Sequence, residues 1–212
     1  MIATFNWDPF LWQALNRNAH KCRMPRALFL HGNTAIGYTD DGARILVGSL
    51  GRVSQKCGKT FEPGPLLFPM AKKNYQRDER IRRAWDDLKA AYVVTIFDYS
   101  APVTDVEAID LLKEGWGDKY GRKIEEFEVI DVKDAESLFQ TWKPFIYSHH
   151  YRTTKSFENS IFGCSPRRSC EALWAQLTEC IFIKRNHAPY RGRWDEVDAF
   201  YGDFLDEERL NA

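Results

Sequence analysis

Polar side chains follow two short apolar runs near the start of the chain, where each run should end as a strand. The first run leads through Thr4 to Asn6 and Asp8, and the second run, residues 27–30, leads to His31. In open α/β sheets, ligands bind at the carboxyl ends of the strands. We therefore expect these four side chains to share one ligand cleft. It would hold an amide that both donates and accepts hydrogen bonds and an imidazole that titrates near neutral pH.

A second candidate ligand site follows the continuous apolar run 92–97. This run is typical of a strand buried on both faces, and Thr104 and Glu107 have the spacing of a capping box that starts the next helix. The amino end of a helix offers unpaired N–H groups to an anion, and Ser100 adds a hydroxyl beside it. The pattern predicts a phosphate site, and it also fits an ordinary, well-capped turn between a strand and a helix.

The run 127–131 predicts one more strand, which ends in Asp131 near the carboxyl edge of the sheet. In nucleotide-binding folds an acid at this place often meets a ribose or an adenine. The same carboxylate is equally suited to capping the helix that follows. Both roles stay open for Asp131, and a purely structural role at a strand end stays open for His31.

Helix signals separate the predicted strands. Asp8 and Pro9 have the residue types of an N-cap and a first helical position, so a helix is expected to start there. Ser165 and Pro166 give the same signal late in the chain. Apolar residues at helical spacing predict further helices over residues 76–91, over residues 104–116 and from Trp194 onward.

The alternation of strands and helices predicts an α/β fold, with a partial Rossmann-like parallel sheet and flanking helices. In this prediction residues 1–38 and 71–132 form the Rossmann-like half. Residues 39–70, which are rich in glycine and proline, form an irregular insert with short strands. Residues 133–212 form a helical C-terminal region.

Composition excludes several classes of protein. The chain has 212 residues, of which 44% are hydrophobic, so a folded core is expected rather than disorder. Its 30 basic and 30 acidic residues cancel, which argues against nucleic acid or an anionic membrane as a general partner. No apolar run approaches the ~20 residues of a membrane span, and no secretion signal is present, so we expect a cytoplasmic protein.

The five cysteines are scattered along the chain, which is typical of reduced thiols in a cytoplasmic protein. Within the insert, Cys57 resembles half of a zinc knuckle. Structural zinc sites need four Cys or His ligands, often in pairs with two residues between the cysteines. Ser54 stands at the place of the partner cysteine and no second pair is present, so we expect no metal.

The order of these motifs resembles that of the sirtuin-like NAD-binding domain, and more closely that of its bacterial branch. Residues 4–8 (Thr-Phe-Asn-Trp-Asp) match the family pattern Thr-x-Asn-x-Asp. Residues 30–32 (Leu-His-Gly) match its His-Gly, and residues 99–102 (Tyr-Ser-Ala-Pro) match its Gly-[Tyr/Thr]-Ser turn. The similarity covers residues 2–132. Members of this branch often hydrolyse NAD and often act in phage defence.

Two features depart from the family pattern. The Gly-Ala-Gly-x-Ser phosphate loop of the family would lie upstream of Thr4 and is absent. We expect this segment to be lost or to come from an upstream domain or a partner. The family's glycine before Tyr99 is replaced by Asp98, whose carboxylate would face a phosphate and repel it. Either departure weakens the case for tight NAD binding.

The resemblance implies cleavage of the bond between nicotinamide and ribose in NAD, through an oxocarbenium-like transition state. Asn6 would contact the ribose hydroxyls and an attacking water, and His31 would act as the general base. Deacylases of this family usually carry a complete zinc module, so NAD hydrolysis is favoured over deacylation. The cofactor-binding residues implied by the resemblance are Thr4, Asp8, Gly32, Ser100, Ala101 and Asp131.

Two functions from different classes are compatible with these residues. The first is a sirtuin-like NAD hydrolase, with NAD as substrate and ADP-ribose as the product-side ligand. The second is a non-catalytic module that keeps the fold and binds a nucleotide or a protein partner. A homo-oligomer or an upstream domain fits either function, because the glycine-rich segment is missing. A nucleic-acid-binding role for Arg167 and Arg168 is opposed by the neutral charge balance.

Overall fold

The computed structural model divides the chain into two compact units. Met1–Asp87 and Val103–Leu111 form the first unit, and Leu88–Pro102 and Leu112–Ala212 form the second. The predicted three-part division of the chain stays a prediction. The residues that the structure describes are 1–21, 23–39, 45–47, 51–55, 57–63, 86–99, 101, 105–117, 126–145, 151–166, 169–181 and 188–210.

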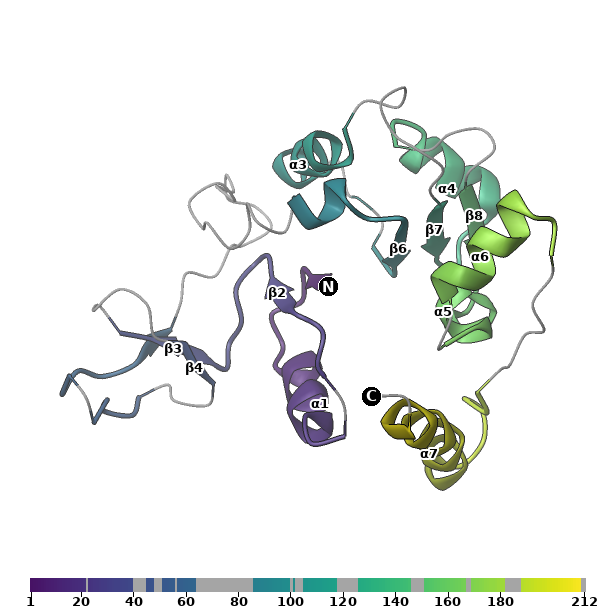
Figure 1. The fold of residues 1–212 in the computed structure, drawn as a ribbon. Coiled ribbons are helices and arrows are strands. Elements are labelled where there is room, and N and C mark those ends of the chain that lie inside the picture. The colour runs from purple at the N-terminus through teal and green to yellow at the C-terminus, as the bar shows by residue number, and fades with distance from the viewer. Residues whose placement is uncertain are drawn as a thin grey trace. The chain divides into compact units, whose positions relative to one another are not determined.

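The first unit contains one parallel pair of strands and one antiparallel sheet (Figure 1). β1 (Ile2–Thr4) pairs in parallel with β2 (Ala27–Phe29), and α1 (Phe10–Asn18) connects them. β3 (Ile36–Tyr38) pairs antiparallel with β4 (Ile45–Val47) and with β5 (Glu62–Pro63). β4 and β5 confirm that the predicted insert contains short strands.

The start of α1 differs from its prediction. Pro9 is the N-cap residue rather than the first helical residue, and its predecessor Asp8 lies outside the cap position. The Asp8 carboxylate still accepts a hydrogen bond from the Phe10 N–H at 3.0 Å, so it pairs the first helical amide from outside. No residue of α1 is buried, and Phe10 is 70% exposed, so this helix adds little to the core.

The second unit is built on a three-stranded parallel sheet in the order β6-β7-β8 (Figure 1). β6 (Val93–Phe97), β7 (Glu126–Ile130) and the connecting α3 (Val106–Trp116) confirm three predicted elements. The residues of α3 up to Leu111 belong to the first unit. After β7, α4 (Ala135–Trp142) leads to β8 (Tyr151–Thr154), a strand within the region predicted to be helical.

The described elements after β8 are helices, in the order η2 (Phe157–Asn159), α5 (Ile161–Cys164), α6 (Ser169–Thr178) and α7 (Trp194–Leu210). The predicted helix start at Ser165 is wrong, because Ser165 is the C-cap of α5. The predicted helix from Trp194 is confirmed by α7. Of the helix predicted over residues 76–91, residues 86–89 are helical and residues 76–85 lie outside the described residues.

β7 is the central strand of its sheet and is buried along its whole length. Because side chains alternate along a strand, its two faces have different neighbours. On one face the Phe127 ring contacts the rings of Trp142 and Phe145, at centroid distances of 5.5 and 6.4 Å. On the other face lie the carboxylates of Glu126 and Glu128. The sheet thus has one aromatic face and one polar face.

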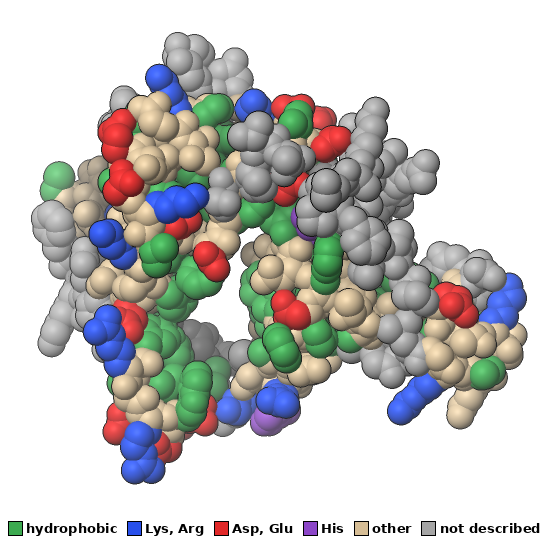
Figure 2. All heavy atoms as spheres, turned by 180° about the vertical axis from the view of Figure 1, so that it is seen from behind, with side chains coloured by type: hydrophobic (Ala, Val, Ile, Leu, Met, Phe, Trp, Pro, Cys, Tyr) green, Lys and Arg blue, Asp and Glu red, His purple; other side chains and the backbone are tan. Residues whose placement is uncertain are grey.

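The structure confirms the predicted α/β fold class, with parallel sheets, flanking helices and a helical C-terminal end, consistent with a partial Rossmann-like arrangement. Figure 2 shows apolar side chains (green) at many places on the described surface, mixed with charged side chains. Within the described part of the chain, no helix combines the length and the apolar character that crossing a membrane requires.

Candidate functional site

The loops that follow β1 and β2 are hydrogen-bonded to each other at two levels. The Leu30 N–H donates to the Thr4 carbonyl at 2.8 Å, which extends the pairing of the strands by one step. Farther along, the Thr34 N–H donates to the Trp7 carbonyl at 3.0 Å, and the Thr34 hydroxyl donates to the same oxygen at 3.1 Å. Asn6 lies between Thr4 and Trp7 in the chain. His31 lies between Leu30 and Thr34, so the two predicted catalytic residues occupy neighbouring loops.

Asn33 joins the two loops through its side chain. Its Nδ2 donates to the Asp8 carbonyl at 3.0 Å, and its Oδ1 accepts from the Ala35 N–H at 2.8 Å. Asn33 is also buried, so both ends of its amide are paired in the interior. We infer that this side chain fixes the distance between the loops. Its place directly after His31 and Gly32 is the only signal in the sequence that pointed to it.

His31 is held in the interior of the first unit. Its side chain is 6% exposed, and its ring meets the Phe5 ring edge-on, with centroids 5.0 Å apart and planes at 61°. Phe5 in turn packs against a core cluster of Leu30, Ala108 and Leu111. Ala108 and Leu111 come from α3, so this helix supports the loop that carries the imidazole.

Asn6 has the opposite environment. The Thr4 hydroxyl accepts a hydrogen bond from the Asn6 N–H at 3.1 Å, which closes a tight turn directly after β1. The Asn6 side chain is exposed at this turn. Its amide is therefore accessible to a ligand, whereas the His31 imidazole is nearly enclosed.

Gly32 has a conformation that other residues rarely adopt. Its φ of 85° lies in the left-handed region, and its N–H donates to the Phe29 carbonyl at 3.1 Å. Glycine reaches this region without a steric penalty. Gly32 thus allows the chain to turn sharply at the end of β2, immediately after His31.

The other predicted cofactor-binding residues belong to the second unit or lie outside the description. Ser100 and Thr104 are outside the described residues. Ala101 follows β6 with a φ of 43°, and Asp131 follows β7 and is buried. The structure therefore gathers Thr4, Asn6, Asp8, His31 and Gly32 in one unit and places Ala101 and Asp131 in the other. Their convergence on one ligand stays a prediction.

One of the two roles left open for Asp131 is wrong. The cap of α4 is Asp134, whose carboxylate accepts from the Ser137 N–H at 2.9 Å and from the Ser137 hydroxyl at 2.8 Å. These bonds hold the pKa of Asp134 below its ordinary value. The Asp131 carboxylate instead accepts from the Lys133 N–H at 3.0 Å and forms a local turn at the carboxyl edge of the sheet.

The turn after β6 contains a packed aromatic side chain and a residue with a left-handed backbone conformation. The Tyr99 ring packs against the Trp142 ring at a centroid distance of 6.1 Å, and burial raises the pKa of Tyr99 to about 12. The preceding Asp98 is exposed and has a φ of 50°. The backbone there has the conformation that favours glycine, although the residue is an aspartate.

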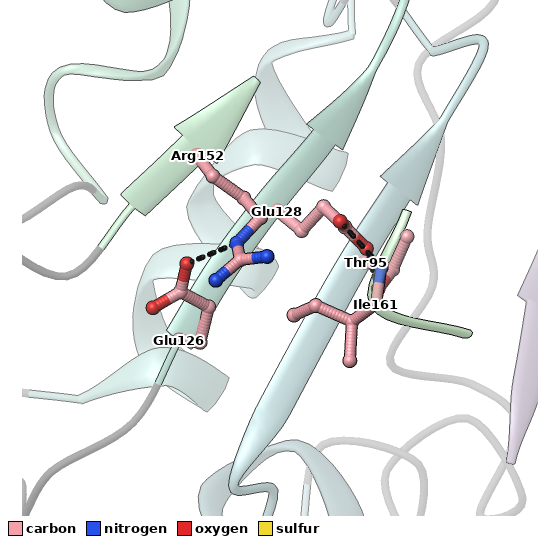
Figure 3. A network of polar contacts seen from close by, with 5 residues as sticks. All are labelled: Thr95, Glu126, Glu128, Arg152 and Ile161. Atoms are coloured by element: carbon pink, nitrogen blue, oxygen red, sulfur yellow. Dashed lines mark hydrogen bonds and ion pairs between the residues drawn. The ribbon is translucent and has the colours of Figure 1, made fainter. Parts of the chain in front are cut away.

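The polar face of β7 carries a network that the sequence did not reveal (Figure 3). The Glu126 carboxylate accepts from Arg152 Nε at 2.8 Å. Glu128 is 0% exposed and accepts from the Thr95 hydroxyl at 3.1 Å and from the Ile161 N–H at 2.9 Å. Burial raises the pKa of Glu128, against the opposing effects of these two donors and of Arg152.

Metal-ligand geometry and similarity to known proteins were both searched for in this chain. In the part of the chain that the structure describes, no cluster of three or more His, Cys, Asp or Glu side chains is placed to hold a metal ion. Comparisons with protein-family models, with curated proteins and with solved structures found no match for this chain. The resemblance to the sirtuin-like domain stays a prediction from the motifs at residues 4–8, 30–32 and 99–102.

Proposed function

We propose that the chain is a sirtuin-like NAD-binding protein that cleaves the bond between nicotinamide and ribose. The observation that carries this proposal is the double hydrogen-bonded link between the loops after β1 and β2. It brackets Asn6 and His31 and brings an amide-bearing loop and an imidazole-bearing loop together. Both loops leave the carboxyl ends of parallel strands, where open α/β sheets bind their ligands.

The two side chains suit the two needs of the reaction. Positive charge develops on the ribose as nicotinamide leaves, and a water then attacks the sugar. The exposed amide of Asn6 both donates and accepts, so it can hold a ribose hydroxyl and the water. The imidazole of His31 can take the proton of that hydroxyl or water, because histidine titrates near neutral pH. Thr4 shapes the Asn6 turn, and Asn33 holds the loops in register.

The resemblance also implies that Ser100 and Ala101 contact the phosphates of NAD and that Asp131 contacts a ribose. Ala101 follows β6 and Asp131 follows β7, whereas Ser100 lies outside the described residues. This assignment follows from the order of the strands and from the resemblance.

The test is a measurement of nicotinamide release from NAD by the purified chain. We expect His31→Ala and Asn6→Ala each to lower the rate at least about 100-fold, as is usual when a general acid–base or positioning group is removed. The matched controls are His20→Ala and Asn16→Ala, whose side chains are exposed near the end of α1. Absence of turnover, or equal losses in the control variants, would exclude the hydrolase.

The non-catalytic alternative is favoured by one specific observation, the exposed carboxylate of Asp98 in the loop after β6. A negative charge there would repel a phosphate. Calorimetric titration with NAD and with ADP-ribose separates the two functions. Binding of either nucleotide without turnover would support a binding module, whereas efficient turnover would exclude it.

A further inference from the structure

The chain after β8 turns back over the polar face of the sheet. This segment, Phe157–Cys164, comprises η2 and α5 and is called the return segment here. At its start, the Phe157 ring meets the Phe97 ring at the carboxyl end of β6, with centroids 6.3 Å apart and planes at 80°. Phe97 is 61% exposed and Phe157 is 40% exposed. The return segment therefore sets the position of an aromatic side chain at the carboxyl edge of this sheet, the edge where open α/β sheets generally bind ligands.

The return segment is internally rigid. The Ser160 hydroxyl donates to the Phe157 carbonyl at 2.6 Å and accepts from the Gly163 N–H at 2.9 Å. A Cβ atom at Gly163 would collide with the Phe157 carbonyl and come within 2.9 Å of the Glu158 carbonyl. Only glycine permits this close approach of α5 to η2. Displacement of α5 is therefore expected to displace Phe157 with it.

The segment is fastened to the sheet through Glu128 (Figure 3). Oε1 of Glu128 accepts from the Ile161 N–H at 2.9 Å, and Oε2 accepts from the Thr95 hydroxyl at 3.1 Å. Ile161 is the first residue of α5, so its N–H has no partner within the helix and needs one from outside. One fully buried carboxylate thus joins β6, β7 and the start of α5.

We propose that Glu128 is a latch that holds the return segment across the sheet and thereby keeps Phe157 against Phe97 at the carboxyl edge. Breaking the hydrogen bond between Glu128 and the Ile161 N–H while both groups stay buried is unfavourable. A buried carboxylate or a buried N–H that has no hydrogen-bond partner destabilises the fold by its full desolvation penalty. Both groups must therefore become exposed to water together. The return segment therefore has two states, fastened and released. This proposal holds whether or not NAD is the ligand.

Hydrogen exchange of the full chain, read by mass spectrometry, tests the latch. Glu128→Ala removes the acceptor, and we expect amide exchange in the return segment to rise on the order of tenfold or more. Exchange in β7 should rise less, because its ladder bonds to β6 and β8 remain. Glu128→Gln keeps an acceptor for the Ile161 N–H and should preserve protection. Glu136→Ala, an exposed change on α4, is the matched control.

A second variant removes the donor instead of the acceptor. Ile161→Pro eliminates the N–H at the first position of α5, where proline is tolerated, and Ser160 already has the extended conformation that precedes proline. It should release the return segment as Glu128→Ala does. Retained protection in either folded variant would overturn the proposal. So would equal loss throughout β6, β7 and β8, including global unfolding of both variants, since that result would make Glu128 a general core residue.

Discussion

The two parallel sheets of this chain place polar side chains at equivalent ends but support them differently. β1 and β2 pair over three residues, and two of the three residues of β1 are exposed. β6 and β7 pair over five residues, and every residue of β7 is buried. The candidate catalytic residues follow the weaker pair. Their positions depend on hydrogen bonds between loops, whereas the loops of the second sheet rest on a packed core.

The helices show the same difference. α1, which connects β1 to β2, has no buried residue. α4, which connects β7 to β8, buries Leu138 and Trp142 and is capped by Asp134. Parallel sheets are normally covered on both faces, because the helices that connect their strands pack on those faces. The second unit meets this requirement on β7, and the β1–β2 pair does not meet it on β1.

The difference in burial between α4 and α1 predicts unequal losses of stability when one aromatic side chain is removed from each helix. Trp142 on α4 is 0% exposed and contacts the rings of Phe127 and Phe145. Trp142→Ala should lower the free energy of unfolding by about 3–5 kcal/mol, because the loss of buried area and the resulting cavity add. Phe10→Ala on α1 should change it by no more than about 0.5 kcal/mol, since that ring is 70% exposed.

Urea unfolding followed by circular dichroism measures both changes, with the midpoint and the slope read from the same curve. Similar losses in the two variants would contradict the comparison, because they would mean that α1 is packed as firmly as α4. A smaller slope for Trp142→Ala alone would show that the second unit unfolds separately.

The sequence predicted two strands of the second sheet, one from a continuous apolar run and one from an alternating run. The run 92–97 and the run 127–131 became β6 and β7. β8 was missed because three of the four residues of Tyr151–Thr154 are polar, so the pattern is not that of a buried strand. Its burial comes from pairing with β7, and Arg152 is matched by Glu126 on that strand. Such a match depends on residues far apart in the chain.

The site was predictable only at the level of single loops. The residue types and the strand ends indicated Asn6 and His31, and the loops that carry them are hydrogen-bonded together. Asn33 was missed because its two partners come from different loops. Glu128 was missed because an acid in an alternating strand usually faces water. Only the return of the chain after β8 encloses it.

The second sheet contains a buried ionisable group, Glu128, on its central strand, so its stability should depend on pH. Burial raises the pKa of Glu128 above its ordinary value of 4.5. At pH values between the ordinary pKa and the raised pKa of the folded state, the folded chain binds more protons than the unfolded chain. In this pH range Glu128 therefore makes the free energy of unfolding fall as pH rises. Glu128→Gln carries no such proton. The stability of Glu128→Gln relative to the unchanged chain should therefore increase with pH across this window and then level off.

Unfolding by urea at several pH values gives this difference directly. Arg152 and Glu126 face the same carboxylate, Arg152 lowering its pKa and Glu126 raising it, so both are kept unchanged in the variant. The control is Glu136→Gln on the exposed side of α4, measured under the same conditions. A difference that falls with pH would mean that the paired donors outweigh burial.

The smallest expected effects concern the turns after β2 and β6, which use the left-handed backbone with different residues. The first turn has Gly32 there, whereas the second has Asp98 and Ala101. The left-handed conformation of a residue with a Cβ atom lowers the stability of the fold by about 1 kcal/mol. Aspartate tolerates this conformation better than alanine does. Ala101→Gly should therefore raise the unfolding midpoint in urea more than Asp98→Gly does. The effect of Gly117→Ala should have the opposite sign, because Gly117 has a φ of 82° and open space around it.

Asp98 also allows backbone strain to be separated from charge in ligand binding. Asp98→Asn removes the negative charge and keeps a side chain that tolerates the left-handed region, whereas Asp98→Gly removes both the charge and the strain. If repulsion of a phosphate limits NAD binding, calorimetry should show tighter binding in both variants by a similar factor. A gain confined to Asp98→Gly would instead assign the limit to the close approach of the backbone, which any side chain at this turn would hinder.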